Sequence, residues 1–334
     1  MSRTAVVFPG RGAYTPASLG SLPAGHPWVR RADEQRREAG LPPLSELDAM
    51  GRFDPSVHLR PLNAWPLVFL ASLLDAERIA EDHEAVVVTA SSTGWYTALA
   101  AAGVLEFDDA FRLVQRMASA ADGSLSDGTP PSELIYALTD DSWRVDPTRT
   151  AALDGAMAAG DGRAFRAIDL GAYGVVSGAL EAVDRIASAV EPASVGGRAY
   201  PLRLPGGDGW HTPLRRAEAE VAAGDLAGLQ WSPPSVTLVD GRGVRFTPWA
   251  TDPGELARYT LVEHPVTRFD TAGAARVALR EHAPEVVLLP GPGTTLGAVC
   301  AHLIVTEGYR GIRSRAEFEV AQRSGAPILL SMRR

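Results

Sequence analysis

The chain has 334 residues, a formal net charge of −8, and arginine as its only Lys/Arg-type cation. A chain of this length can bury one large core or form two lobes. Its 46% hydrophobic and 22% charged residues are ordinary for a globular protein. The acidic balance argues against nucleic-acid binding, which needs a basic face. The lack of lysine excludes Schiff-base chemistry.

The single cysteine, Cys300, excludes an intrachain disulfide and favours a cytoplasmic location. No apolar run approaches the roughly 20 residues of a membrane helix, so we expect no membrane association. Residues 1–4 lead directly into a predicted strand, and we expect no signal peptide.

The first part of the chain predicts an α/β pattern, in which buried strands lead into helices. In chain order, we expect a strand at 4–10, a polar helix near 27–38, a core-facing helix at 66–79, a strand at 84–90, and helices at 93–103 and 107–121. The rest of the stretch 12–62 is rich in Pro and Gly and is expected to be irregular.

The pattern changes after a Gly- and Pro-containing linker at 122–131. In chain order, we expect a strand at 133–138, a helix at 148–159, strands at 164–169 and 174–178, a helix at 180–190 and a strand at 198–204. This β-α-β-β-α-β order is ferredoxin-like. We therefore predict a ferredoxin-like small subdomain over 128–204, inserted into an α/β-hydrolase-like large domain made of 1–127 and 205–334. The last strand is expected at 285–289, and the active site in the cleft between the lobes.

The segment VVVTASSTGWYTALA at 86–100 predicts a strand, a tight turn and a helix, with Ser92 at the turn. A serine in this position lies beside the free N–H groups of the new helix, which can stabilise an oxyanion. The usual elbow is G-x-S-x-G, and here it is Ala-Ser-Ser-Thr-Gly, with Gly94 kept. The same pattern also fits plain βα packing, so other segments have to decide between the two interpretations.

Several ordered motifs make the chain resemble the malonyl-CoA:acyl-carrier-protein transacylases and the acyltransferase domains of polyketide synthases. The motifs are AVVFPGRG at 5–12, STGWYTAL at 92–99, WHTPL at 210–214 and LLPGPG at 288–293, with weaker matches at 63–66, 109–114, 173–178 and 264–266. The family has F-P-G-Q-G, G-H-S-x-G-E-Y-S-A-L, H-T-P-L/M and V-G-P-G at these places, and the resemblance spans nearly the whole chain.

The resemblance implies a Ser–His dyad of Ser92 and His211, because a serine hydroxyl needs a base to act as a nucleophile at neutral pH. It also implies that a main-chain carbonyl near Thr267 orients the histidine. The oxyanion hole would use the backbone N–H groups of Arg11 and Thr93. Arg11 stands where the family has glutamine, and its side chain could either enter the pocket or point to solvent.

The other histidines have simpler interpretations. We expect His26, His58, His83 and His282 at the surface, His302 in the core or at its boundary, and His264, before Pro265, in a structural role.

Departures from the family pattern bear on the acyl group. Ser91 replaces the histidine before the nucleophile, Trp95 replaces a glutamate, and Trp65 replaces a glutamine. Malonyl-selective members have an arginine three residues past the Leu-Val pair on the helix after the elbow, and this chain has Met117 there. Arg116 lies one residue before the position of the family's arginine. One residue corresponds to a rotation of about 100° round the helix, so Arg116 is not expected to take that arginine's place. Met117 favours an apolar acyl group, although it also fits ordinary helix core.

We therefore predict a free-standing acyltransferase that uses CoA or phosphopantetheine thioesters as substrates, with no bound cofactor and no metal. Its partners would be acyl-CoA and an acyl carrier protein in polyketide or fatty-acid-like biosynthesis. An acidic carrier needs a local arginine patch. The candidates are Arg30, Arg31, Arg36 and Arg37, and the pair Arg215 and Arg216, although each also fits a solvated helix face. An acyl-thioester hydrolase and a non-catalytic binding protein remain as alternatives.

Overall fold

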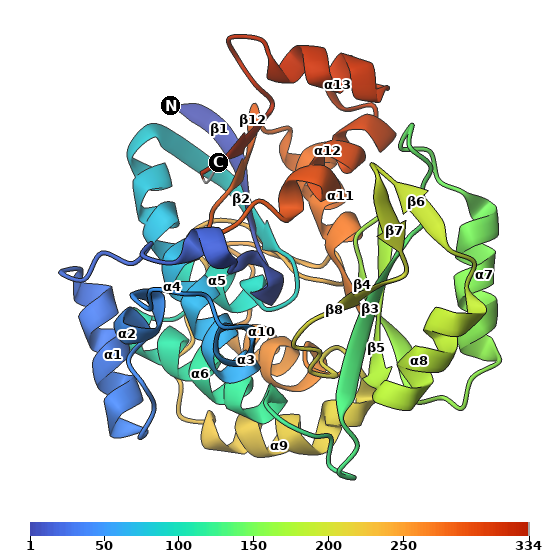
Figure 1. Ribbon diagram of the computed structural model, residues 1–334. Helices are drawn as coiled ribbons and strands as arrows, with labels where there is room; N and C mark the ends of the chain where they lie inside the picture. The colour runs from blue at the N-terminus through green and yellow to red at the C-terminus, as the bar shows by residue number, and fades with distance from the viewer. Residues whose placement is uncertain (333–334) are drawn as a thin grey trace.

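The computed structural model describes residues 1–332, which form an α/β arrangement around two sheets (Figure 1). The larger sheet has the order β10-β9-β2-β1-β12-β13. Its strands are β1 (Ser2–Phe8), β2 (His83–Ala90), β9 (Leu238–Val239), β10 (Arg245–Phe246), β12 (Val286–Leu289) and β13 (Leu329–Ser331). All its pairs are parallel except β9 with β10. This is the predicted hydrolase-like sheet.

Helices cover both faces of this sheet, as its parallel strands require. The helices that contact its strands are α4 (Pro61–Asp82) and α5 (Gly94–Ala101) on one face, and α11 (Thr271–His282) and α12 (Leu296–Thr306) on the other. The other helices of this part of the chain pack on helices, and they are α1 (Pro27–Glu38), α2 (Leu44–Asp48), α3 (Pro55–His58), α6 (Phe107–Ala121), α9 (Arg216–Asp225), α10 (Pro253–Arg258) and α13 (Arg315–Gln322). The side chains of β1 alternate between the faces. Val6 and Phe8 join the cluster with α4, α5 and α6, whereas Val7 joins the cluster with α11 and α12.

The second sheet has the order β11-β4-β5-β3-β8, to the right in Figure 1. Its strands are β3 (Pro131–Ala137), β4 (Ala164–Asp169), β5 (Tyr173–Ala179), β8 (Leu202–Leu204) and β11 (Phe269–Asp270), and its helices are α7 (Pro147–Ala158) and α8 (Leu180–Ala189). A short hairpin, β6 (Ala193–Val195) with β7 (Arg198–Tyr200), precedes β8. From β3 to β8 the order of elements is ferredoxin-like, as predicted. The domain limits at 128 and 204 stay a prediction.

Several features differ from the sequence expectations. The expected strand 198–204 is split into β7 and β8, which pair in different sheets, and the sequence analysis did not predict β9, β10, β11, α10 or α11. The predicted irregular stretch 12–62 contains α2 and α3 besides α1, and β13 adds a strand beyond the expected last one. Helix α4 begins at Pro61 and contains Pro66 inside it. An internal proline cannot donate to the carbonyl four residues earlier, here Leu62. The buried Arg36 donates to that carbonyl instead, at 2.9 Å, and so compensates for the missing helical bond.

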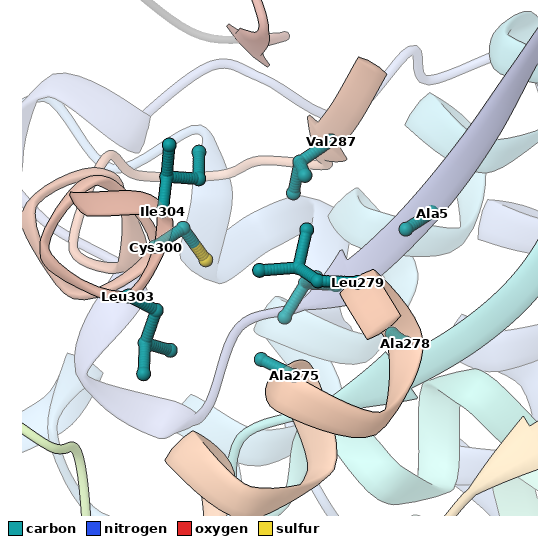
Figure 2. A pocket seen from close by; sticks show the side chains of 9 residues that line it. Ala5, Ala275, Ala278, Leu279, Val287, Cys300, Leu303 and Ile304 are labelled. Atoms are coloured by element: carbon teal, nitrogen blue, oxygen red, sulfur yellow. The ribbon is translucent and has the colours of Figure 1, made fainter. Parts of the chain in front are cut away.

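The single cysteine lies in the layer formed by α11 and α12. Figure 2 shows its thiol facing a small apolar void lined by β1, α11, β12 and α12. Burial raises the pKa of Cys300 to about 12. Because the thiolate is the reactive form, Cys300 is inert at neutral pH.

Candidate active site

The nucleophile elbow forms where β2 ends and α5 begins. Ser92 has a positive φ of 52°, a strained conformation for a non-glycine residue that is typical of functional turns. The turn packs tightly on the end of β1, because a Cβ on Gly94 would lie 2.6 Å from the carbonyl oxygens of Phe8 and Pro9. This contact explains why the elbow keeps Gly94 although it lost the earlier glycine.

Ser92 and His211, distant in sequence, meet at this turn. Ser92 Oγ and His211 Nε2 are 2.8 Å apart, within the reach a nucleophile and its base need. His211 Nδ1 lies 2.8 Å from the carbonyl oxygen of His264, which fixes a tautomer that leaves Nε2 free to accept the serine proton. The predicted orienting residue, Thr267, lies just beyond this carbonyl along the same turn.

The surroundings of His211 keep it neutral. Burial lowers its pKa to about 4, although the backbones of His264 and Thr267 and the charge of Asp208 oppose that shift. A neutral imidazole is the form that acts as a general base. Ser92 and His211 expose only 6% and 2% of their surfaces, so little water can reach the dyad.

A second histidine supports the base. The His264 ring stacks on the His211 ring with centroids 4.8 Å apart and on Tyr96 at 5.1 Å. Both ring nitrogens of His264 are buried and lack hydrogen-bond partners among the described residues, and burial lowers its pKa well below the usual range. His264 therefore has the structural role expected for it, and its ring packs directly against His211, the candidate base.

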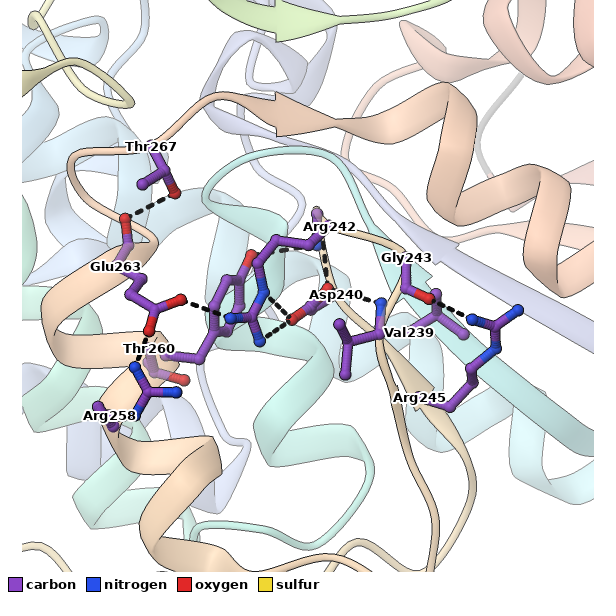
Figure 3. A network of polar contacts seen from close by, with 12 residues as sticks. Val239, Asp240, Arg242, Gly243, Arg245, Arg258, Thr260, Glu263 and Thr267 are labelled. Carbon is purple, nitrogen blue, oxygen red and sulfur yellow. Dashed lines mark hydrogen bonds and ion pairs between the residues drawn. The ribbon is translucent and has the colours of Figure 1, made fainter.

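A polar network holds the turn that carries the His264 carbonyl (Figure 3). Arg242 donates to buried Asp240 at 2.7 and 2.8 Å and to Glu263 at 2.5 Å, and Arg258 also pairs with Glu263. The Glu263 carbonyl in turn accepts hydrogen bonds from the backbone N–H and the hydroxyl of Thr267. The network thus ties β9 to the segment 259–267 that orients the base.

The two predicted oxyanion donors lie at helix starts. Thr93 is the N-cap residue of α5, and Arg11 begins the short 3₁₀ helix Arg11–Ala13 that follows β1. N–H groups at such positions have no intrahelical acceptor, so both can serve an oxyanion.

The Arg11 side chain is held inside the protein. It pairs with Glu133 of β3 and with Asp208, and it donates to the carbonyls of Pro205 and Gly206. Of the two alternatives that the sequence left open for Arg11, the structure does not support a side chain that points to solvent. The sequence analysis missed Glu133 and Asp208, because no local pattern marks two acids that are far apart in the chain.

The structure does not bring all the predicted substrate-binding residues to the dyad. Arg116 pairs with Asp225 of α9 at 2.7 Å, and Ser91 Oγ accepts a hydrogen bond from Thr271. Trp95 is fully buried and donates to Thr260 at 2.9 Å. Trp65 lies closer, since its ring packs on Tyr96 and Trp210, the neighbour of His211. Met117 is fully buried in the same core cluster.

Other predicted surface residues are buried. His58 is completely covered and donates or accepts at both ring nitrogens. Arg36 and Arg215, from the two predicted arginine clusters, are also completely buried. Arg215 donates to the carbonyls of Ala121, Gly123, Ser124 and Asp208. It therefore fastens the segment before His211 to the end of α6 and cannot contribute to a surface patch.

Over residues 1–332, no group of three or more His, Cys, Asp or Glu side chains could hold a metal ion. In the same described part of the chain, no helix combines the length and apolar character needed to cross a bilayer.

Comparisons with known proteins show what the chain is similar to in sequence and in fold. No family model matches the chain. The malonyl CoA-acyl carrier protein transacylase of Escherichia coli O157:H7 is 26% identical over 314 residues, covering 92% of this chain and 94% of the relative.

Solved structures share the fold at lower identity. The acyl-carrier-protein S-malonyltransferase from Burkholderia pseudomallei has a TM-score of 0.73 at 21% identity, over 98% of this chain and 95% of that one. The acyltransferase domain from the second module of the salinomycin polyketide synthase has a TM-score of 0.71 at 22% identity, over 100% of this chain and 69% of that one. In sequence, the chain is therefore similar to malonyl CoA-acyl carrier protein transacylases, and it shares its fold with an acyl-carrier-protein S-malonyltransferase and a polyketide synthase acyltransferase domain.

Proposed function

We propose that this protein is an acyltransferase that moves an acyl group between CoA or acyl-carrier-protein thioesters through an acyl-Ser92 intermediate. The observation that carries the proposal is the 2.8 Å contact between Ser92 Oγ and His211 Nε2, with Nδ1 bound to a carbonyl. The names of the relatives support thioester and carrier-protein substrates. The pathway would be polyketide or fatty-acid-like biosynthesis.

The proposed chemistry proceeds in two similar halves. His211 Nε2 takes the Ser92 proton as Oγ attacks the thioester carbonyl, and the N–H groups of Arg11 and Thr93 bind the oxyanion. The C–S bond breaks, and the imidazolium returns the proton to the leaving thiolate. The acceptor thiol then repeats the sequence in reverse. The low exposure of the dyad favours transfer to a thiol over transfer to water.

We further propose that the acyl group carries no free carboxylate. Met117, at the position of the family's carboxylate-binding arginine, is uncharged and fully buried. Neither nearby arginine replaces it, because Arg116 pairs with Asp225 and Arg11 pairs with two acids. A carboxylate buried without a partner costs several kcal/mol.

Intact mass spectrometry with a panel of acyl thioesters, with and without carrier protein, tests the proposed activity. We expect an acyl adduct that the carrier thiol discharges, and no adduct in Ser92→Ala. Ser91→Ala is the matched control and should still acylate. Free acid without transfer would instead establish a hydrolase, and no adduct with any thioester would establish a non-catalytic protein.

Competition between malonyl and acetyl thioesters tests the acyl preference. We expect acetyl to acylate Ser92 faster by roughly 10²-fold, since each tenfold corresponds to about 1.4 kcal/mol. Met117→Arg should reduce the ratio of the acetyl to the malonyl acylation rate. The control, Arg116→Gln, should leave this ratio unchanged. Equal or faster acylation by malonyl would refute the preference.

A further inference from the structure

The Arg11 side chain lies in a cage of acceptors that joins three parts of the molecule. Its Nε is 3.0 Å from Asp208 Oδ2, its Nη2 pairs with Glu133 Oε2, and its Nη1 donates to the Gly206 carbonyl at 2.5 Å. Glu133 belongs to β3 of the small sheet, and Asp208 to the segment that leads to His211. One guanidinium thus links the oxyanion loop, the small sheet and the connector of the base.

This triad, defined as Arg11, Glu133 and Asp208, sets two carboxyl groups against one guanidinium. Burial and the nearby charge of Asp208 raise the pKa of Glu133 to about 7, so the triad carries its full excess of negative charge only above that pH. The side chains of Glu133 and Asp208 are only 4% and 1% exposed, and that of Arg11 is 14% exposed. Two carboxyl groups therefore share one arginine away from water, where charges interact strongly. The Ser177 hydroxyl donates to Glu133 at 3.1 Å, and the backbone N–H of Trp210 donates to Asp208 Oδ1 at 2.9 Å.

The triad lies close to the reacting group. Arg11 itself supplies a proposed oxyanion N–H, so an acyl carbonyl on Ser92 would lie against its backbone. The charges of Asp208 and Arg11 also act on His211, Asp208 favouring the protonated ring and Arg11 opposing it. Arg215 also lies beside Asp208, but it adds no net positive charge there because it pairs with Glu218.

We propose that Glu133 and Asp208 are specificity-determining residues that exclude carboxylated acyl groups, by occupying Arg11 and leaving the triad with an excess of negative charge. This inference rests on the proposed acyl transfer and deepens it. It explains the proposed preference for acyl groups without a free carboxylate by a second group of residues, in addition to Met117. A carboxylate on the acyl chain would meet two acids that already hold the nearby cation, whereas a neutral chain meets no such penalty.

A series of charge variants tests the proposal. The assay is run about 1.5 pH units above the raised pKa of Glu133, where both acids are ionised. There the triad has a charge of −1 in wild type, 0 in Glu133→Gln or Asp208→Asn, +1 in the double variant, and −2 in Arg11→Gln. The measured quantity is the ratio of Ser92 acylation rates with malonyl and acetyl N-acetylcysteamine thioesters, whose carrier portion is uncharged. We expect this ratio to rise along the series from −2 to +1, by roughly tenfold per unit of charge at low salt.

Two controls separate the possible outcomes. Ser177→Ala removes a hydrogen bond to Glu133 without changing charge and should leave the ratio unaltered, and circular dichroism checks that each variant folds. If acetyl acylates the variants but the ratio stays constant along the series, the proposal is refuted. If neither thioester acylates wild type, the proposed acyl transfer itself fails.

Discussion

At the scale of single residues, the candidate site combines a strained serine with a histidine that is buried and neutral. Sequence motifs, taken with their resemblance to a known family, singled out Ser92 and His211, and the structure brings these two side chains into contact. The same motifs could not predict the acids around Arg11 or the stacking of His264 on His211. Those contacts join segments far apart in the chain, and only the folded structure brings them together.

The two stacked histidines predict a pH-dependent loss of stability. Burial lowers the pKa of His211 to about 4 and that of His264 well below its usual 6.5. Below about pH 6.5 the unfolded chain therefore binds protons that the folded protein does not, so the free energy of unfolding falls as pH falls from 6.5 towards 4. Above pH 6.5 both forms are neutral, and the two histidines add no slope.

His264→Phe keeps a ring in the stack and removes one of these titrations. We expect its free energy of unfolding to fall less steeply between pH 6.5 and 4, by up to about 1.4 kcal/mol per pH unit. Urea denaturation of both proteins at several pH values measures the difference, and titrations common to both cancel. Equal slopes over this range would contradict the prediction.

At the scale of elements, the sequence predicted most helices and strands of the two sheets, because their hydrophobic periodicity is clear. It placed the start of α4 at Pro66, since proline usually begins a helix. The helix instead begins at Pro61, and an arginine from α1 substitutes for the missing N–H. Local propensity cannot anticipate a donor supplied by another helix.

Arg36→Met tests this compensation. The Arg36 guanidinium donates to the carbonyls of Pro42 and Leu62 and to the side chains of Asn63 and Gln115, at 2.6–2.9 Å. Burial lowers its pKa to about 10. The loss of these four hydrogen bonds should cost about 2–4 kcal/mol in urea denaturation, with the Leu62 carbonyl keeping only a longer bond from Gln115 Nε2 at 3.4 Å.

A second substitution tests whether the stability lost in Arg36→Met comes from the Leu62 carbonyl. Pro66→Ala restores a backbone N–H to the Leu62 carbonyl, so it should recover part of the stability in the Arg36→Met background. A double-mutant cycle measures this coupling, and Arg37→Met, at an exposed position, is the matched control. Additive effects of the two substitutions would show that Arg36 does not compensate for Pro66.

At the scale of the whole molecule, Cys300 can report on the integrity of the layer formed by α11 and α12. Its raised pKa and its apolar surroundings (Figure 2) predict that a thiol reagent at pH 7.5 reacts at least about 100-fold more slowly with the native protein than with the urea-unfolded chain. Ellman's reagent measures both rates. Rapid native labelling would mean that this layer opens readily.

The small strand β11 has a mechanical consequence for proton transfer. It pairs in parallel with β4 of the small sheet, and Arg268 beside it pairs with Asp169. The same stretch of backbone carries the His264 carbonyl, while the Phe269 ring packs against His211. A rotation of the small sheet as a body would therefore pull on the tether of the catalytic imidazole. A displacement of the small sheet would thus be transmitted through β11 to the alignment of His211 Nε2 with Ser92 Oγ.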